Sequence, residues 1–297
     1  MVEKKFEGVF TAIITPFKKD EGVDYQALGK LINFQIKKGV AGIVPCGTTG
    51  ESPTLDHKEH AKVIKFTIKK VKGRCLVIAG TGSNSTKEAI SLSQHAEADG
   101  ADALLIVNPY YNKPTQEGLY RHFKAIADSV KIPVIVYNIK GRTAVNVETP
   151  TLMRIVAECK NVVGVKEASG DMNQIRNVIA QRPNGFSVLS GDDNIALELI
   201  KSGGNGVISV ASNAIPDRMV KLVNLALEGK FGEAEIVNKE LAPLFSAEFI
   251  ETNPIPIKFM VSQMGKCEEV YRLPMCEMSA EHKEKVLQVM KELKILK

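Results

Sequence analysis

The sequence predicts an α/β fold, a (β/α)8 TIM barrel with a C-terminal helical extension. Short apolar, β-branched runs alternate with stretches whose apolar residues recur at helical spacing, and this alternation repeats eight times in units of similar length. An open doubly wound sheet is the alternative, but no GxGxxG motif follows the first run, which favours a closed barrel. The expected strands are residues 8–17, 41–47, 75–80, 102–108, 132–138, 161–167, 186–191 and 206–212.

The stretches between these runs carry signals of helix ends. Ser85 or Thr86 stands ahead of Glu88 as a candidate N-cap, and Asp171 precedes a second periodic stretch. Glycines typical of left-handed helix stops are Gly39, Gly100 and Gly203.

The strand pattern stops near residue 229. We therefore expect residues 1–229 to form the barrel with the active site, and residues 230–297 to form helices packed on it.

Composition narrows the classes of function. The net charge of +5 is spread over interspersed acids and bases, and the basic clusters are too short to indicate nucleic-acid binding. The five cysteines form no CxxC pair, which indicates reduced thiols in a cytoplasm. The apolar run near the start is too short for a signal peptide or a membrane span, so we expect no membrane association.

Polar side chains gather where the expected strands end, which is where barrels of this class place their chemistry. These candidates are Thr48, Thr49, Tyr110, Tyr111, Tyr137, Arg142, Lys166, Asp192 and Asp193, and the last expected strand holds Ile208 and Ser209.

Lys166 ends the apolar run NVVGVKE, where a lysine must reach out to water, pair with an acid or lose its charge. Tyr137 ends the preceding strand, so both side chains can point into one mouth. A dry pocket favours the neutral amine, which forms a Schiff base with a ketone, and a nearby phenol and hydroxyl can move the protons. Such chemistry needs neither a metal nor a cofactor. The alternative is an ion pair of Lys166 with Glu167, Asp171 or an acid on the next strand.

Other site types are less well supported. GTTGES (47–52) lacks the GK[ST] of a phosphate loop, and Asp192 and Asp193 would repel a phosphate. His57 and His60 share a helical face, but no third zinc ligand is in view. Cys46 has no adjacent histidine to activate it, so we expect a small buried residue.

Five motifs together resemble the dihydrodipicolinate synthase family, in the superfamily of pyruvate-dependent aldolases that includes N-acetylneuraminate lyase. They are GTTGESPTL, NPYYNKPTQEGLYRHF, YNIKGRT, GVKEASGD and ETNPIPIK, and the resemblance runs over about residues 6 to 290. It implies condensation of pyruvate with L-aspartate 4-semialdehyde to 4-hydroxy-tetrahydrodipicolinate, on the route to diaminopimelate and lysine. It also implies a homotetramer built from two tight dimers.

The resemblance implies roles for single residues. Lys166 would form the Schiff base, with Tyr137 as proton donor and acceptor. Thr49 would hold the pyruvate carboxylate and share a proton relay with Tyr137, completed by Tyr111 from a neighbouring subunit. Thr48 would lie beside this relay and the Ile208 backbone would face pyruvate. Arg142 would clamp the carboxylate of the second substrate.

Some family members are inhibited by lysine in a cleft at the dimer interface. The matching positions are Ser52, Pro53, His57, His60, Asn84, Glu88 and Tyr110, with proline at 53 where alanine is familiar. Beside Arg142, Lys140 and Ala144 replace a familiar proline and glycine.

Two other functions compete with the synthase. One is pyruvate release from N-acetylneuraminate or a 2-keto-3-deoxy sugar acid, but a polyol tail calls for hydroxyl partners rather than Arg142. The other is a ligand-binding protein without catalysis, which the intact set of Lys166, Tyr137, Thr49 and Tyr111 disfavours.

Overall fold

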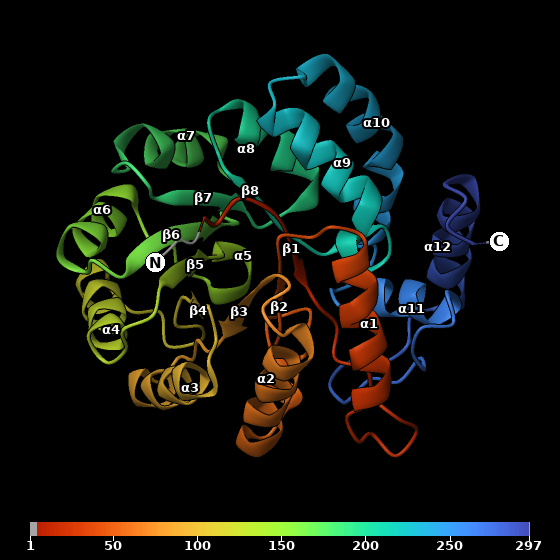
Figure 1. Cartoon of the computed structure of the whole chain (residues 1–297), viewed down its shortest axis with the longest axis horizontal. Helices are drawn as coiled ribbons and strands as arrows, with labels where there is room; N and C mark the ends of the chain where they lie inside the picture. Colours follow the sequence, from red (N-terminus) through yellow and green to blue (C-terminus); the bar gives the residue numbers. More distant parts are fainter. Residues whose placement is uncertain (1–4, 297) are drawn as a thin grey trace.

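Eight parallel strands close into a barrel in the computed structural model, which describes residues 5–296 (Figure 1). Each strand pairs with the next in sequence, and the first pairs with the last. The strands are β1 (Gly8–Ala12), β2 (Gly42–Val44), β3 (Leu76–Gly80), β4 (Ala103–Val107), β5 (Val134–Asn138), β6 (Val162–Glu167), β7 (Ser187–Ser190) and β8 (Gly206–Ser209). The predicted fold class is therefore confirmed.

Helices follow the strands and surround the barrel (Figure 1). Those of the barrel are α1 (Tyr25–Lys37), α2 (His57–Val71), α3 (Thr86–Asp99), α4 (Gln116–Asp128), α5 (Lys140–Thr143), α6 (Thr149–Glu158), α7 (Met172–Gln181), α8 (Ala196–Lys201) and α9 (Pro216–Leu227). Short 3-10 turns at Ser52–Thr54, Asp193–Ile195 and Ala211–Asn213 lie in the loops after β2, β7 and β8.

The predicted helix ends are found in the structure. The Ser85 hydroxyl accepts a hydrogen bond from the backbone N–H of Glu88, and the Asp171 carboxylate accepts from the first turn of α7. The three predicted stop glycines have left-handed φ angles of 84°, 93° and 102° at Gly39, Gly100 and Gly203.

The first expected strand is shorter than predicted. β1 ends at Ala12, and the apolar residues Ile13, Ile14 and Phe17 that follow are buried in the layer between sheet and helices. Their hydrophobicity therefore reflects packing outside the sheet. A second apolar cluster fills the interior of the barrel. It includes Phe10, Ile78, Ile135, Tyr137 and Ile208.

Residues beyond α9 form α10 (Phe231–Ala247), α11 (Ile255–Gln263) and α12 (Ala280–Glu292). In Figure 1, α11 lies on the side of α1 away from α2, and α12 lies farther out, packed against α10 and α11. The segment between α10 and α11 returns to the barrel, where Asn253 contacts the loop after β2. None of the helices within residues 5–296 is long and apolar enough to cross a membrane.

Candidate active site

Tyr137 and Lys166 are register partners on β5 and β6. Lys166 is 5% exposed, and its Nζ lies 4.0 Å from the centroid of the Tyr137 ring. Inward-pointing positions at the carboxyl ends of adjacent barrel strands bring the two together. A buried amine therefore lies over the ring of a phenol at the barrel mouth.

The acids that the sequence offers as partners for Lys166 are engaged elsewhere. The Glu167 carboxylate, one residue along the strand, points to the opposite face and accepts hydrogen bonds from Asn138 and from the backbone N–H of Ser169. Asp171 caps α7. Within residues 5–296, no acid forms an ion pair with Lys166, which argues against the alternative that this lysine is held by a carboxylate.

The loop that carries Thr48 and Thr49 is fixed from two sides. Thr49 is buried, and its Oγ1 accepts a hydrogen bond of 3.0 Å from Nδ2 of Asn253. Glu51 has a left-handed φ of 53°, and its Oε1 lies 2.5 Å from Nζ of Lys258 on α11. Glu51 is 1% exposed and Lys258 0%.

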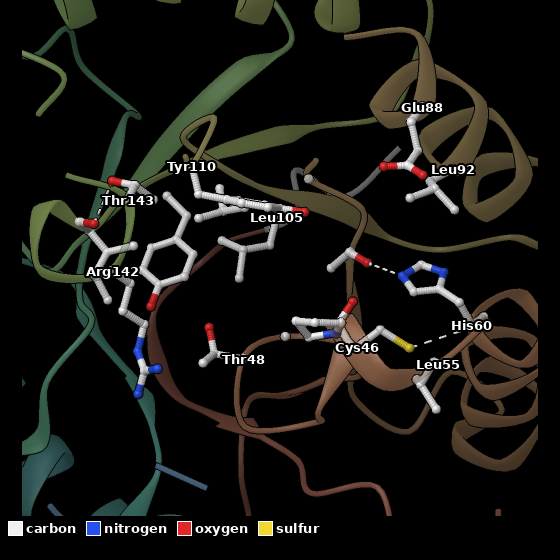
Figure 2. Close-up of a pocket in the computed structure, with 18 of the residues that line it drawn as sticks. Cys46, Thr48, Leu55, His60, Glu88, Leu92, Leu105, Tyr110, Arg142 and Thr143 are labelled. Carbon is white, nitrogen blue, oxygen red and sulfur yellow. Dashed lines mark hydrogen bonds between the residues drawn. The ribbon is translucent and has the colours of Figure 1, made fainter. Parts of the chain in front are cut away.

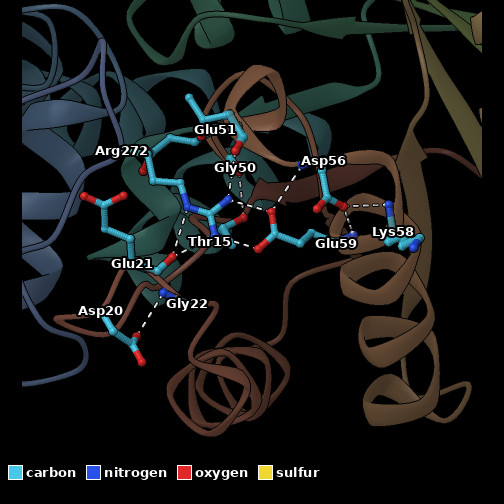
Figure 3. Close-up of polar contacts among 11 residues, drawn as sticks. Thr15, Asp20, Glu21, Gly22, Gly50, Glu51, Asp56, Lys58, Glu59 and Arg272 are labelled. Atoms are coloured by element: carbon cyan, nitrogen blue, oxygen red, sulfur yellow. Dashed lines mark hydrogen bonds and ion pairs between the residues drawn. The ribbon is translucent and has the colours of Figure 1, made fainter.

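Arg272 holds the segment after this loop. Its guanidinium binds both carboxylate oxygens of Glu59, at 2.6 and 2.7 Å, and the backbone carbonyl of Thr54 (Figure 3). On the other side, the Thr15 hydroxyl donates to the carbonyl of Gly50 at 2.6 Å. Residues of the C-terminal extension, together with Thr15, thus brace the loop that holds two candidate catalytic hydroxyls.

Arg142 lies on the short helix α5, and its Nη2 donates to the backbone carbonyl of Asn253 at 3.1 Å. Ala144 ends α5 with a left-handed φ of 61°, the conformation that the familiar glycine would adopt more readily. Lys140 is exposed and opens the same helix.

One cavity collects most of the predicted residues. Its wall includes Thr48, Thr49, Tyr137, Arg142, Lys166 and Ile208, together with Asp192 and Asn253. Tyr111 is outside it: its side chain is 89% exposed and its φ is 73°. A single chain therefore assembles every predicted catalytic residue except Tyr111.

A second cavity, of about 390 Å³, continues outward from Tyr137, Arg142 and Thr48 to the predicted effector positions. Figure 2 shows Arg142 and Thr48 at one end, Glu88 and His60 at the other, and Tyr110 between them. Its wall includes Ser52, Pro53, His57, His60, Glu88 and Tyr110. Asn84 is not in this wall, and its carbonyl accepts from Asn112.

The outer end of this cavity is polar and acidic. Nε2 of His57 lies 2.7 Å from Oε1 of Glu88, and the Ser83 hydroxyl donates to the other oxygen. The hydrogen bond from Ser83 lowers the pKa of Glu88, and the hydrogen bond and charge of His57 add to this effect. Burial lowers the pKa of His60, which contacts the carbonyl of Gly80 at 2.9 Å. Glu88 thus places a carboxylate at the outer end of this cavity.

The side chains of the two aspartates after β7, Asp192 and Asp193, have different surroundings. Asp193 is buried, and its Oδ2 accepts from the backbone N–H groups of Val210 and Ala211 at 2.8 and 2.9 Å. Asp192 faces the cavity. Behind Asp193, burial raises the pKa of Glu248 well above its usual range, and the charge of Asp193 adds to this.

Sequence reasoning missed the contributions of Asn253, Lys258 and Glu248. The signal for Lys258 was present, because a lysine within the apolar stretch PIPIKFMV needs a buried partner. The contacts of Asn253 and Lys258 span 204 and 207 residues, which no local pattern reveals.

Comparison with known proteins identifies the family. The family model described as the dihydrodipicolinate synthetase family matches residues 5–293. A relative from Endomicrobium trichonymphae, named 4-hydroxy-tetrahydrodipicolinate synthase, is 52% identical over 98% of this chain and 100% of its own.

Solved structures agree in fold over nearly the whole chain. The dihydrodipicolinate synthase from Aquifex aeolicus has a TM-score of 0.96 at 48% identity, covering 98% of this chain and 99% of its own. The enzyme from Cyanidioschyzon merolae, solved with lysine bound, has a TM-score of 0.96 at 37% identity, with the same coverage of both chains.

Proposed function

This chain belongs to the dihydrodipicolinate synthetase family, and we propose that it works as a 4-hydroxy-tetrahydrodipicolinate synthase with Lys166 as its Schiff-base residue. It is a lyase that condenses pyruvate with L-aspartate 4-semialdehyde, at the entry to the diaminopimelate and lysine route. The observation that carries the assignment of Lys166 is its buried Nζ at the barrel mouth, 4.0 Å from the Tyr137 ring and without an acid partner among residues 5–296.

The chemistry follows from an unpaired amine beside a phenol. Nζ of Lys166 attacks C2 of pyruvate, water leaves, and the iminium makes a C3 proton acidic. Loss of that proton gives an enamine, whose C3 attacks the aldehyde carbon of the second substrate. Tyr137 and Thr49 move the protons. The substrate amine then attacks C2, closes the ring and releases Lys166 as a free amine.

The remaining residues of the cavity wall bind and orient. The Thr49 hydroxyl, fixed by Asn253, holds the pyruvate carboxylate. Thr48 lies beside it, and the backbone of Ile208 faces pyruvate. Arg142 binds the carboxylate of the semialdehyde through its guanidinium fork.

Tyr111 acts from a neighbouring subunit in this proposal. An aromatic side chain that is 89% exposed, on a backbone with φ of 73°, is poorly placed for a lone chain and well placed to reach into another. We therefore propose a homotetramer of two dimers. Sedimentation should show a tetramer, and Tyr111→Phe should lower turnover without changing assembly.

Lysine is the proposed effector of the outer cavity. Glu88 offers a carboxylate to an ammonium group, His57 lies beside it, and the Cyanidioschyzon merolae relative was solved with lysine bound. Millimolar lysine should slow turnover of the wild type. A Glu88→Gln variant should respond much less, because the charge that attracts the ammonium is gone.

Two broader assignments are also proposals. We divide the chain into a barrel over residues 1–229 and an extension over residues 230–297, although Asn253 makes the extension part of the active site. We propose a cytoplasmic location, which the five free thiols support.

Two assays test the function. Purified protein should consume pyruvate only when aspartate semialdehyde is present, which separates it from a lyase that releases pyruvate from keto sugar acids. Borohydride with pyruvate should leave a reduced adduct on Lys166, and Lys166→Ala should show none. A wild type that forms no adduct would overturn every Schiff-base mechanism, including a lyase.

A further inference from the structure

Behind the wall of the Lys166 cavity lie three buried acid oxygens that have no donor among residues 5–296. They are both carboxyl oxygens of Glu248 and Oδ1 of Asp193. Glu248 is 0% exposed and Asp193 is 1% exposed, so bulk water does not reach them. Buried polar atoms without a partner are rare in proteins, and several in one place indicate a feature with a purpose.

No cation balances a charge at this place. Glu248 follows the last turn of α10, which packs against the short turn Asp193–Ile195. The charged groups that act on Glu248 are Asp193 and Asp192, and both are acids. Among residues 5–296, no basic side chain forms an ion pair with Glu248. An ionised Glu248 is therefore a buried charge beside a like charge, which is the costly state.

One proton on Glu248 resolves this arrangement. Oδ2 of Asp193 already accepts from the backbone N–H groups of Val210 and Ala211, and two N–H donors suit a carboxylate there. A protonated carboxyl group has one O–H donor. The Glu248 carboxyl lies within hydrogen-bonding reach of the Asp193 side chain. Its O–H therefore has an acceptor in Oδ1 of Asp193, the oxygen that the backbone leaves free.

The backbone that Asp193 holds belongs to the pyruvate end of the site. β8 ends at Ser209, and Ile208 and Val210 on either side of it line the cavity around Lys166. Asp193 is not in the wall of this cavity and reaches the backbone from behind. Its carboxylate binds the chain two and three residues after Ile208, so its orientation affects where the Ile208 backbone lies.

We propose that Glu248 keeps its proton and donates it in a hydrogen bond to Oδ1 of Asp193, and that this Glu248–Asp193 pair positions the end of β8 for pyruvate. The link to pyruvate rests on the proposed function. Both are positioning residues, because they lie behind the cavity wall and touch no reacting atom. A hydrogen bond from a neutral acid to a carboxylate is stronger than one between two neutral groups, which suits a fixed support in a dry place.

The proton is tested by infrared difference spectroscopy of wild type against Glu248→Gln near neutral pH in heavy water. A protonated carboxyl group has a carbonyl stretch at higher frequency than an amide or a carboxylate. We expect such a band in the wild type and its loss in Glu248→Gln. Glu240→Gln is the matched control, since it removes an exposed carboxylate from the same helix and should leave the band unchanged. If Glu248→Gln removes no such band, Glu248 is ionised and the proposal is overturned.

The positioning role is tested by pyruvate kinetics of Glu248→Gln and Glu248→Met. The glutamine amide can still donate to Asp193, so KM for pyruvate should change less than about twofold. Methionine fills similar space without a donor and leaves Oδ1 of Asp193 unpaired. Its KM for pyruvate should rise about threefold to tenfold, the range that one hydrogen bond supplies. Its kcat should move less than about twofold, because the pair touches neither Lys166 nor Tyr137.

Two further results would overturn the positioning role. An equal KM for pyruvate in Glu248→Gln and Glu248→Met would show that the donor does not position β8. A fall in kcat of Glu248→Met that tracks its loss of unfolding free energy, with KM unchanged, would show a structural role alone. A wild type that forms no borohydride adduct with pyruvate would overturn the proposed function and the link to pyruvate with it, whereas the infrared result would still decide whether the two acids share a proton.

Discussion

The protein buries one lysine at the barrel mouth and another where α11 meets the loop after β2. The two differ in whether a carboxylate pairs with the lysine. Lys166 is 5% exposed and has no ion pair within residues 5–296. Lys258 is 0% exposed and lies 2.5 Å from Oε1 of Glu51. Burial alone therefore does not distinguish the lysine that we propose to be reactive from a structural one, whereas the presence of a partner carboxylate does.

The aromatic surroundings of the two lysines are similar. Nζ of Lys258 lies 4.0 Å from the Phe17 ring centroid, and Nζ of Lys166 lies 4.0 Å from that of Tyr137. Lys258 also lies 5.5 Å from the ring centroid of Tyr271, whose hydroxyl donates to the carbonyl of Ile255. What differs is the Glu51 carboxylate, which forms an ion pair with Lys258. Burial lowers the pKa of Lys258 and Glu51 opposes the change.

The largest expected effect is on Lys166→Arg. Arginine keeps the positive charge and much of the volume but cannot form a Schiff base under these conditions. We expect kcat/KM to fall by at least about a thousandfold, with no borohydride adduct by mass spectrometry. An adduct that maps to Lys258 in this variant would contradict the comparison, because a paired lysine should not react.

Lys258→Met should leave Schiff-base formation at Lys166 intact but lower the unfolding free energy of the protein. The substitution leaves the Glu51 carboxylate buried without a cation, which costs about 3–5 kcal/mol of unfolding free energy. Urea denaturation would measure the loss. The double variant Lys258→Met, Glu51→Gln should recover much of it, because no buried charge remains. Equal stability of the single and double variants would show that packing, rather than the charge, dominates.

The sequence predicts one half of this comparison better than the other. Eight β-branched runs locate the strands, and the ends of two neighbouring strands place Tyr137 and Lys166 together. The Glu51–Lys258 pair joins residues 207 positions apart, so its partner could not be read from the sequence. The same holds for Asn253 and Thr49.

Two other differences between the sequence-based prediction and the structure have physical causes. The length of β1 was overestimated because Ile13, Ile14 and Phe17 are apolar for packing against helices. Tyr111 is outside the cavity of a single chain, and the neighbouring subunit into which we propose that it reaches cannot be placed from one sequence.

Glu248 is a third buried ionisable group, and burial raises its pKa so that the protonated, neutral form is favoured. Its raised pKa means that the folded state holds a proton that the unfolded chain loses above its ordinary value of 4.5. Stability from this group therefore falls as pH rises from about 4.5 towards the folded pKa. Glu248→Gln cannot titrate, so urea unfolding should favour the variant increasingly as pH rises above about 5. A difference independent of pH would contradict this.

The smallest effect is expected at an exposed ion pair of almost the same length. Nζ of Lys38 lies 2.6 Å from Oδ2 of Asp217, with 36% and 54% of the two side chains exposed. Water solvates both charges after Lys38→Met, so the loss should be about 0–1 kcal/mol and should shrink as salt is added. Lys258→Met should show little dependence on salt, because its pair is dry. If urea unfolding gave the same loss for both variants, distance rather than burial would set the worth of the pair, and the contrast between the paired and the unpaired buried lysine would lose its physical basis.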